Sequence, residues 1–154
     1  MTSYKHTQIG YLILLILLAL GLFYVWLYGV ISTEIGSNFA IIAVMALILF
    51  MLASFSTLKV TIDENYLRLK FGYGIFWKKF PVREIISAKT VKNHWYYGWG
   101  IRLWLWPYMW IYNVSGFDAV EITMKNGKIY RIGTDAPGEL ETAIKQAINY
   151  SNQE

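Results

Sequence analysis

Cysteine is absent from this chain of 154 residues, and histidine occurs only at positions 6 and 94. The absence of cysteine excludes disulfides and thiolate metal ligands, and two histidines are too few for a histidine-rich metal site. Charged residues are scarce as well, at 16% of the chain against about 25% in typical soluble domains, whereas hydrophobic residues reach 56%. The composition therefore predicts no metal and no cofactor, and it indicates that part of the chain lies in an apolar environment.

Two segments near the N-terminus contain no charged residue. The first covers residues 11–31 and the second covers residues 39–55. A helix over the first segment would be about 31 Å long at about 1.5 Å per residue, which matches the hydrocarbon core of a bilayer. The second segment is at the short end of spanning length, and a buried core helix is the alternative for it. Because residues 32–38 are too few to do more than turn the chain, we predict a helical hairpin that crosses the membrane twice.

Lysine and arginine predict the orientation of this hairpin. The turn at residues 32–38 contains neither, whereas Lys5 precedes the first span and Lys59, Arg68 and Lys70 follow the second. Basic residues collect on the cytoplasmic side of membrane proteins. We therefore expect a multi-pass protein of the inner or plasma membrane, with both termini in the cytoplasm.

The chain then divides into six segments. Residues 56–102, which directly follow the spans, carry nine Lys/Arg against three Asp/Glu, and anionic lipid would attract such a basic region. The predicted segments are a cytoplasmic tail (1–10), a transmembrane helix (11–31), an external loop (32–38), a second transmembrane helix (39–55), a cytoplasmic domain (56–150) and a second tail (151–154).

The predicted cytoplasmic domain begins with a β-hairpin pattern between residues 58 and 71. Apolar and polar residues alternate in both halves, and a two-residue turn at Glu64-Asn65 would pair residue 62 with 67, 60 with 69 and 58 with 71. This register places the apolar side chains on one face and the charged side chains on the other. A shift by one residue would destroy that separation, so the pattern specifies the register.

Further strands and one helix follow. Strands are predicted at residues 75–80, 85–91, 119–124 and 128–132, with a turn at Asn126-Gly127 between the last two. The period then changes to that of a helix, with one apolar stripe formed by Leu140, Ala143, Ile144, Ala147 and Ile148. Asp135 is the expected N-cap, Pro137 suits the first turn, and Glu139 complements the positive end of the helix dipole. Six or seven antiparallel strands closed by one C-terminal amphipathic helix give an α+β fold.

Several short motifs of the domain resemble one protein family. They are TIDENYLRLKFGYG, FPVREI, YGWGIR, YNVSGFDAVEI and KNGKIYRIGTDAPGELETAI. Together with the helical hairpin they make the chain similar to bacterial membrane-anchored pleckstrin-homology-like (PH-like) domain proteins, over roughly residues 56–150. The resemblance implies an adaptor for lipids, peptides or proteins, and the fold alone does not choose among these. Members that bind phosphoinositides use a basic turn between the first two strands, whereas the turn Asp63-Glu64-Asn65 is acidic here.

Residues 94–112 hold five of the seven tryptophans and a single arginine, Arg102. A third membrane span is disfavoured, because Arg102 lies near its centre and Pro107 interrupts a helix. In an extended chain the even-numbered residues would place five aromatic rings on one face, those of Trp104, Trp106, Tyr108, Trp110 and Tyr112. One interpretation makes this stripe part of the domain core. The other makes it a contact surface for the membrane interface, where Trp and Tyr concentrate, or for a partner protein.

The candidate contact residues fall into an aromatic set and a basic set. The aromatic set, expected to meet membrane or partner, is Trp95, Trp99, Trp104, Trp106, Tyr108, Trp110 and Tyr112. The basic set, expected either to meet lipid headgroups or to be solvated, is Lys78, Lys79, Arg83, Lys89 and Lys92.

No catalytic motif is found in the sequence. It contains no G-x-S-x-G elbow, and its glycine pairs lack the rest of a phosphate-binding loop. We therefore expect a non-catalytic PH-like interaction module that recruits or assembles with a protein partner, including another copy of itself, at the cytoplasmic face. The alternative is a lipid-surface binder that uses aromatic and basic residues on anionic headgroups. Nucleic acid is not an expected partner, given the membrane anchor and a net charge of +4.

Overall fold

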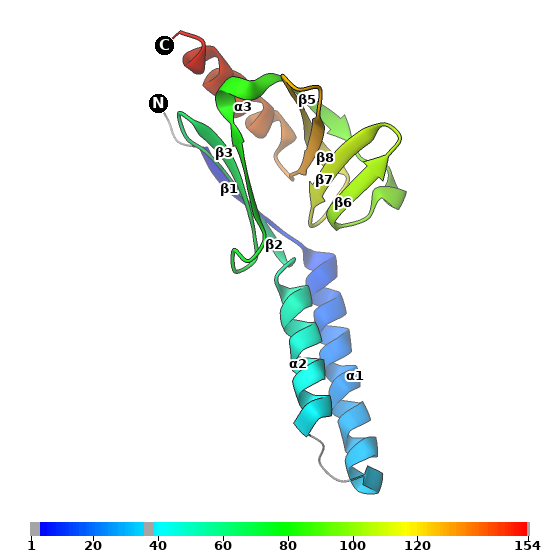
Figure 1. The fold of residues 1–154 in the computed structure, drawn as a ribbon. Coiled ribbons are helices and arrows are strands. Elements are labelled where there is room, and N and C mark those ends of the chain that lie inside the picture. The colour runs from blue at the N-terminus through cyan, green and yellow to red at the C-terminus, as the bar shows by residue number, and fades with distance from the viewer. Residues whose placement is uncertain (1–3, 36–38, 154) are drawn as a thin grey trace.

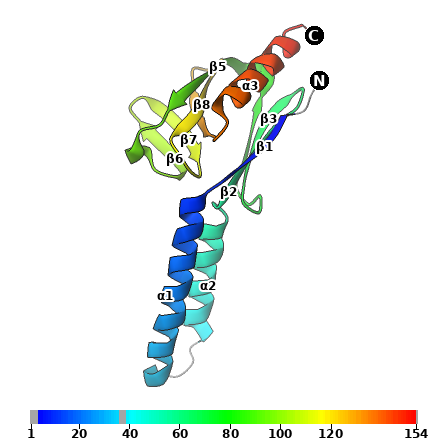
Figure 2. The same cartoon turned by 180° about the vertical axis from the view of Figure 1, so that it is seen from behind.

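Two apolar helices extend away from a part built of two β-sheets and a third helix (Figure 1). The computed structural model describes residues 4–35 and 39–153 of the chain. The described ends of the chain lie close together, at the end of the molecule opposite the one where α1 ends and α2 begins, as both views show (Figures 1 and 2). The architecture is therefore a mixed α+β fold with an apolar N-terminal helix.

The two apolar helices are α1 (Tyr11–Ile35) and α2 (Phe39–Ala53). They lie side by side in both views (Figures 1 and 2). Within the described residues, α1 alone is long and apolar enough to cross a membrane, over the 21 residues Tyr11–Ile31, and its most apolar window has no buried residue. Helix α2 has 15 residues, none of them buried, and is about 22 Å long. Both helices therefore present large apolar side chains that nothing in the described structure covers.

A strand precedes α1 where the sequence predicted a tail. Strand β1 (Tyr4–Ile9) pairs antiparallel with β2 (Thr57–Ile62), with Tyr4 opposite Ile62 and Ile9 opposite Thr57. The prediction of a tail over residues 1–10 is thus wrong for residues 4–9. Apolar alternation could not reveal β1, because its inward side chains are mostly polar and are held by hydrogen bonds, such as the one from Gln8 Nε2 to the Ser115 carbonyl at 2.9 Å.

The first sheet has the order β1-β2-β3-β4, all antiparallel. Its other two strands are β3 (Tyr66–Phe71) and β4 (Trp77–Pro81). The predicted register of the β2–β3 hairpin is confirmed: Leu58 is opposite Phe71, Val60 opposite Leu69 and Ile62 opposite Leu67. At the turn, Asp63 Oδ1 accepts the backbone N–H groups of Asn65 and Tyr66, at 3.0 and 2.7 Å.

The second sheet has the order β5-β8-β9-β7-β6, in which β7 and β9 are parallel and the other neighbours antiparallel. Its strands and the short 3-10 helices near them are η1 (Val82–Glu84), β5 (Ile85–Lys92), η2 (Trp95–Tyr97), β6 (Gly100–Leu105), β7 (Tyr108–Asn113), β8 (Asp118–Met124) and β9 (Ile129–Gly133). Within the described residues, β2 to β9 make eight strands where six or seven were predicted, because the aromatic stretch folds into two strands.

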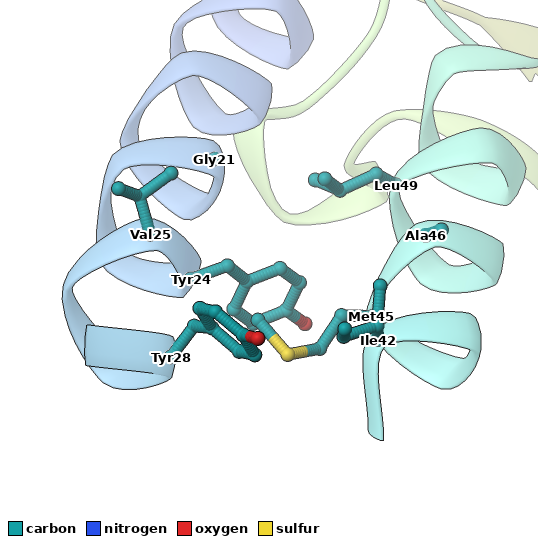
Figure 3. Close-up of a pocket in the computed structure, with 8 residues that line it drawn as sticks. All are labelled: Gly21, Tyr24, Val25, Tyr28, Ile42, Met45, Ala46 and Leu49. Atoms are coloured by element: carbon teal, nitrogen blue, oxygen red, sulfur yellow. The ribbon is translucent and has the colours of Figure 1, made fainter. Parts of the chain in front are cut away.

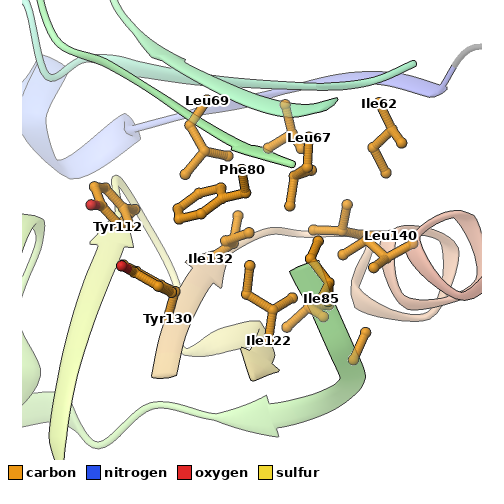
Figure 4. Close-up of a cluster of buried hydrophobic side chains, with 14 of the residues drawn as sticks. Ile62, Leu67, Leu69, Phe80, Ile85, Tyr112, Ile122, Tyr130, Ile132 and Leu140 are labelled. Carbon is orange, nitrogen blue, oxygen red and sulfur yellow. The ribbon is translucent and has the colours of Figure 1, made fainter. Parts of the chain in front are cut away.

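The main core lies between the two sheets and helix α3 (Pro137–Ser151) (Figure 4). The first sheet contributes residues such as Leu67 and Leu69, and the second contributes Ile122 and Ile132, all of them fully buried. The predicted helical stripe faces this core, with Leu140, Ile144 and Ala147 buried and Ala143 and Ile148 partly buried. The buried apolar faces therefore join both sheets and α3 into one unit.

The start of α3 differs from the prediction in one respect. The N-cap is Ala136 rather than Asp135, and it has no side-chain cap hydrogen bond, while Pro137 occupies the first turn as expected. The Ala136 N–H donates instead to Thr134 Oγ1 at 3.1 Å. Asp135 is engaged elsewhere, because its carboxylate contacts Nε2 of His6 on β1. This contact ties the N-terminal strand to the beginning of α3.

Candidate functional site

The aromatic stretch folds into a hairpin, which divides the predicted aromatic stripe between two faces. Strands β6 and β7 pair so that Trp104 is opposite Met109 and Leu103 opposite Trp110. Directly opposite residues of an antiparallel pair point to the same face, so even-numbered residues of β6 share a face with odd-numbered residues of β7. The prediction of five aromatic rings on one face is wrong, because it assumed a single extended strand without a turn at Trp106-Pro107.

Part of the aromatic stretch belongs to the interior. Tyr112 is buried and Trp110 packs against the same main core. Burial, and then the neighbouring Tyr130, raises the pKa of the Tyr112 hydroxyl to about 12, so Tyr112 stays neutral at physiological pH. On the opposite face of the second sheet, Tyr97 and residues of β7 form a smaller cluster against which Trp104 packs.

Another part of the stretch is exposed. Trp106 is 90% exposed, Trp95 is 77% exposed and Leu105 is 74% exposed. We call Trp95, Tyr96, Leu105, Trp106 and Tyr108 the aromatic patch; all five are exposed, and Leu105 and Tyr108 lie on the face of the hairpin opposite that of Trp104.

Ring contacts and one hydrogen bond connect parts of the aromatic patch to the fold. The Trp95 and Tyr96 rings lie 5.9 Å apart, and the Tyr96 ring lies 5.5 Å from that of Trp104. Trp104 Nε1 also donates to the Trp106 carbonyl at 2.9 Å. The patch is therefore attached to the packed ring of Trp104 at both η2 and the β6–β7 turn.

An ion-pair network centred on the buried carboxylate of Glu121 lies beside Tyr97. The carboxylate of Glu121 accepts from Lys89 Nζ at 3.0 Å and from Arg131 Nε at 2.8 Å, and the Arg131 guanidinium lies 5.6 Å from the centre of the Tyr97 ring. Burial by itself raises the pKa of the Glu121 carboxyl. The hydrogen bonds and charges of Lys89 and Arg131 lower it by more, so this pKa lies below its usual value. Lys89, which the sequence proposed as a headgroup contact, reaches Glu121 from the surface, because its side chain is 65% exposed.

The other predicted basic residues are spread over three elements. Lys79 lies 5.1 Å from the centre of the Tyr66 ring, and Lys78 lines a hollow of about 200 Å³ beside Trp77. Arg83 is in η1, which contacts α3, and Lys92 ends β5. Together with Lys89, the five predicted basic residues therefore lie on β4, η1 and β5, in different surroundings.

A second exposed aromatic group, which the sequence did not single out, lies at the junction of the helices and the first sheet. Tyr73, in the β3–β4 turn, stacks on Phe50 of α2 with ring centres 5.5 Å apart. Trp77 at the start of β4 is 61% exposed, and Phe76 stacks on Phe55 at 4.9 Å. The signal in the sequence was the apolar run in GYGIFWKKF, which was interpreted only as a strand.

The connection between the helices and the sheets is short and tightly packed. A Cβ atom on Gly72, which has φ of 42°, would lie 2.5 Å from the Ser54 carbonyl oxygen, and one on Gly10 would lie 3.0 Å from that of Ser56. The Gly10 N–H also donates to the Ser56 carbonyl at 2.7 Å. The sheets are therefore held close to the ends of α1 and α2 rather than attached through a long linker.

Two apolar cavities border the helices. One, of about 420 Å³, lies between α1 and α2, and Figure 3 shows Tyr24 and Tyr28 of α1 pointing toward Met45 of α2 across it. The other, of about 500 Å³, lies where α1, the end of α2 and the start of β6 meet, and it includes Trp99 and Arg102.

Neither the chemistry nor the comparisons identify a reaction. Within the described part of the chain, no group of three His, Cys, Asp or Glu side chains comes together to hold a metal ion. In comparisons with known proteins, no family model, no curated protein and no solved structure matches this chain. The function has to be argued from the exposed surfaces and from the apolar helices.

Proposed function

We propose that this protein is a membrane-anchored, non-catalytic interaction module. A PH-like domain, held by a hairpin of two transmembrane helices, recruits or assembles with a protein partner at the cytoplasmic face of a bacterial cell membrane. The two sheets and the packed C-terminal helix support the PH-like assignment. The aromatic patch is the surface proposed for the partner.

The order of elements supports the hairpin. Strand β1 leads directly into α1, and α2 is followed after three residues by β2. Because β1 and β2 are antiparallel neighbours, the start of α1 and the end of α2 lie at the same end of the helix pair. If α1 crosses the bilayer, α2 has to return the chain to the side on which it began. A helix of about 22 Å is short for this, and local thinning of the bilayer can accommodate it at modest cost.

The charge distribution supports the cytoplasmic side. The part that follows the helices carries the excess of basic residues, and Lys5 lies on β1 at the same end of the helix pair. By the positive-inside rule this end faces the cytoplasm.

The observation that carries the proposal is the exposure of Trp106. A tryptophan that is 90% exposed contributes little to the stability of the domain, whereas Trp is among the residues that contribute most when buried in a protein interface. The other patch residues are aromatic or apolar as well, and aromatic residues are enriched in protein interfaces.

Site-specific photo-cross-linking in the native membrane tests this proposal. A photoreactive amino acid at position 106 is expected to capture a discrete partner or a second copy of the chain. The matched control carries the same photoreactive amino acid in place of Thr142, which is exposed on α3 outside the patch. Equal products at both positions, or none at position 106, would contradict the proposed role of the patch.

A lipid-surface function is the second candidate, favoured by the aromatic residues at the junction. Tyr73 stacks on α2 and Trp77 is exposed nearby on β4, so both lie where a bilayer interface would surround the helix ends. The dependence of binding on ionic strength distinguishes the two candidate functions. Binding through lysine and headgroups weakens from low to high ionic strength, whereas binding through an apolar protein interface changes little.

A further inference from the structure

The cavity at the junction differs from the rest of the apolar helix surface because it has a charged wall. Its apolar wall is formed by Leu12, Ile13 and Ile16 of α1 together with Leu52 and Phe55. The opposite wall is the start of β6 and the residue before it, from Trp99 to Arg102. At about 500 Å³ the cavity has the size of a small-molecule site.

The polar groups of this wall have unused hydrogen-bonding capacity. Arg102 Nε donates to the Trp99 carbonyl at 3.3 Å, and the guanidinium forms no ion pair with any carboxylate of the described residues. Trp99 Nε1 is a buried donor without a hydrogen-bond partner in the same part of the chain. The wall therefore offers the full positive charge of Arg102, and it contains no acidic side chain.

If residues 11–31 of α1 cross the hydrocarbon core as proposed, the cavity lies where this span meets the headgroup region of one leaflet. Leu12 and Ile16 lie in the first turns of α1, and Ile16 is about 7.5 Å along the helix axis from Tyr11. The headgroup region of one leaflet is about 5–8 Å thick. An arginine at this level can keep its guanidinium among phosphates while its alkyl stem contacts apolar side chains.

We propose that this cavity binds an anionic membrane phospholipid. Its phosphate is held by the Arg102 guanidinium beside Trp99, and an acyl chain follows the apolar wall formed by α1 and the end of α2. Charge complementarity selects the phosphate, and the wall of α1 is continuous with the surface proposed to lie in hydrocarbon. The inference rests on the proposed membrane insertion of α1, and it is independent of a protein partner at the aromatic patch.

Lipid titration of the purified full-length chain tests the inference. The protein is delipidated in mild detergent and titrated with phosphatidylglycerol, and the bound lipid is counted by native mass spectrometry. Substitution Arg102→Gln is expected to weaken binding about tenfold, since a charge-assisted hydrogen bond is lost. The matched control is Arg68→Gln, because Arg68 is exposed on β3 and pairs with Asp63 at 2.9 Å, away from the cavity. Arg102→Lys keeps the charge and is expected to lose less than Arg102→Gln.

Three results would overturn the inference. They are equal binding by Arg102→Gln and the parent, equal losses in Arg102→Lys and Arg102→Gln, and displacement of the lipid by millimolar inorganic phosphate, which would indicate a small-anion site. Near-ultraviolet circular dichroism checks that each variant is folded. Extraction of the parent from membranes with alkaline carbonate is a separate measurement: release of the protein would contradict the anchor itself, whatever the lipid titration shows.

Discussion

Among the glycines of the described residues, Gly133 at the end of β9 has the least space for a side chain. A Cβ atom there would lie 2.0 Å from Oδ1 of Asn113. The Asn113 side chain is buried and bonds to the Gly116 carbonyl and the Ser115 N–H, at 3.0 and 3.3 Å. It cannot move away without losing these bonds, so β7, β9 and the 113–116 turn all depend on the glycine.

Substitution Gly133→Ala is therefore expected to destabilise the protein by about 2–3 kcal/mol, the cost of overpacking a filled site. Urea unfolding of the full chain in mild detergent, followed by tryptophan fluorescence, measures the loss. Gly138→Ala is the control, because a Cβ atom there meets nothing within 4 Å, and we expect it to be neutral or slightly stabilising. Equal effects of the two substitutions would show that Asn113 adapts at little cost.

Glu121 is expected to give part of the stability a dependence on acid. Its pKa in the folded state lies below the usual value of 4.5, so its contribution is complete above that value. The contribution is lost as the pH falls through the lower, folded-state pKa. Glu121→Gln should be less stable than the parent by about 1–3 kcal/mol at pH 7, with a smaller difference at pH 3. Unfolding midpoints at both pH values measure this; a constant difference would contradict the role assigned to Lys89 and Arg131.

The sequence predicted the role of a residue correctly where that role depends on residues nearby in the chain. The inward apolar positions of β2, β3 and α3 follow from periodicity, and their burial is confirmed. The role of Asp135 was predicted wrongly, because its partner His6 is 129 positions away in the chain. The alternation within the aromatic stretch was also insufficient, since the turn at Trp106-Pro107 decides which rings share a face.

At the scale of elements, β1 is the part that sequence patterns did not reveal. It forms the edge of the first sheet and also contacts the loop after β7 through the hydrogen bond of Gln8 to Ser115. Strand β1 therefore connects the two sheets as well as leading into α1.

Substitution Gln8→Ala tests this connection. It removes a buried side chain and leaves the Ser115 carbonyl without its donor, so we expect a loss of about 1–3 kcal/mol in unfolding free energy. Thr7→Ala changes the neighbouring exposed position of β1 and should cost less than about 0.5 kcal/mol. Urea unfolding of both variants in mild detergent provides the comparison. If both behave like the parent, β1 does not contribute to holding the sheets together.

For the whole molecule, the arrangement of β1, α1, α2 and β2 determines how the proposed membrane hairpin is joined to the sheets. The antiparallel β1–β2 pair holds the start of α1 and the end of α2 next to the first sheet. The close contacts of Gly10 and Gly72 leave little freedom at this junction. The domain is thus expected to stay near the bilayer surface, with Tyr73, Trp77 and Arg102 at the level of the headgroups and the aromatic patch available to a partner.

Cysteine labelling in intact cells tests the central claim most directly, and the absence of native cysteine makes single-cysteine variants unambiguous. Thr7→Cys and Asn152→Cys mark β1 and the end of the domain, and Ser37→Cys marks the connection between the two helices. We predict that a membrane-impermeant maleimide labels position 37 in intact cells, and positions 7 and 152 only after permeabilisation. Labelling of position 152 in intact cells, or opposite sidedness of positions 7 and 152, would contradict the account.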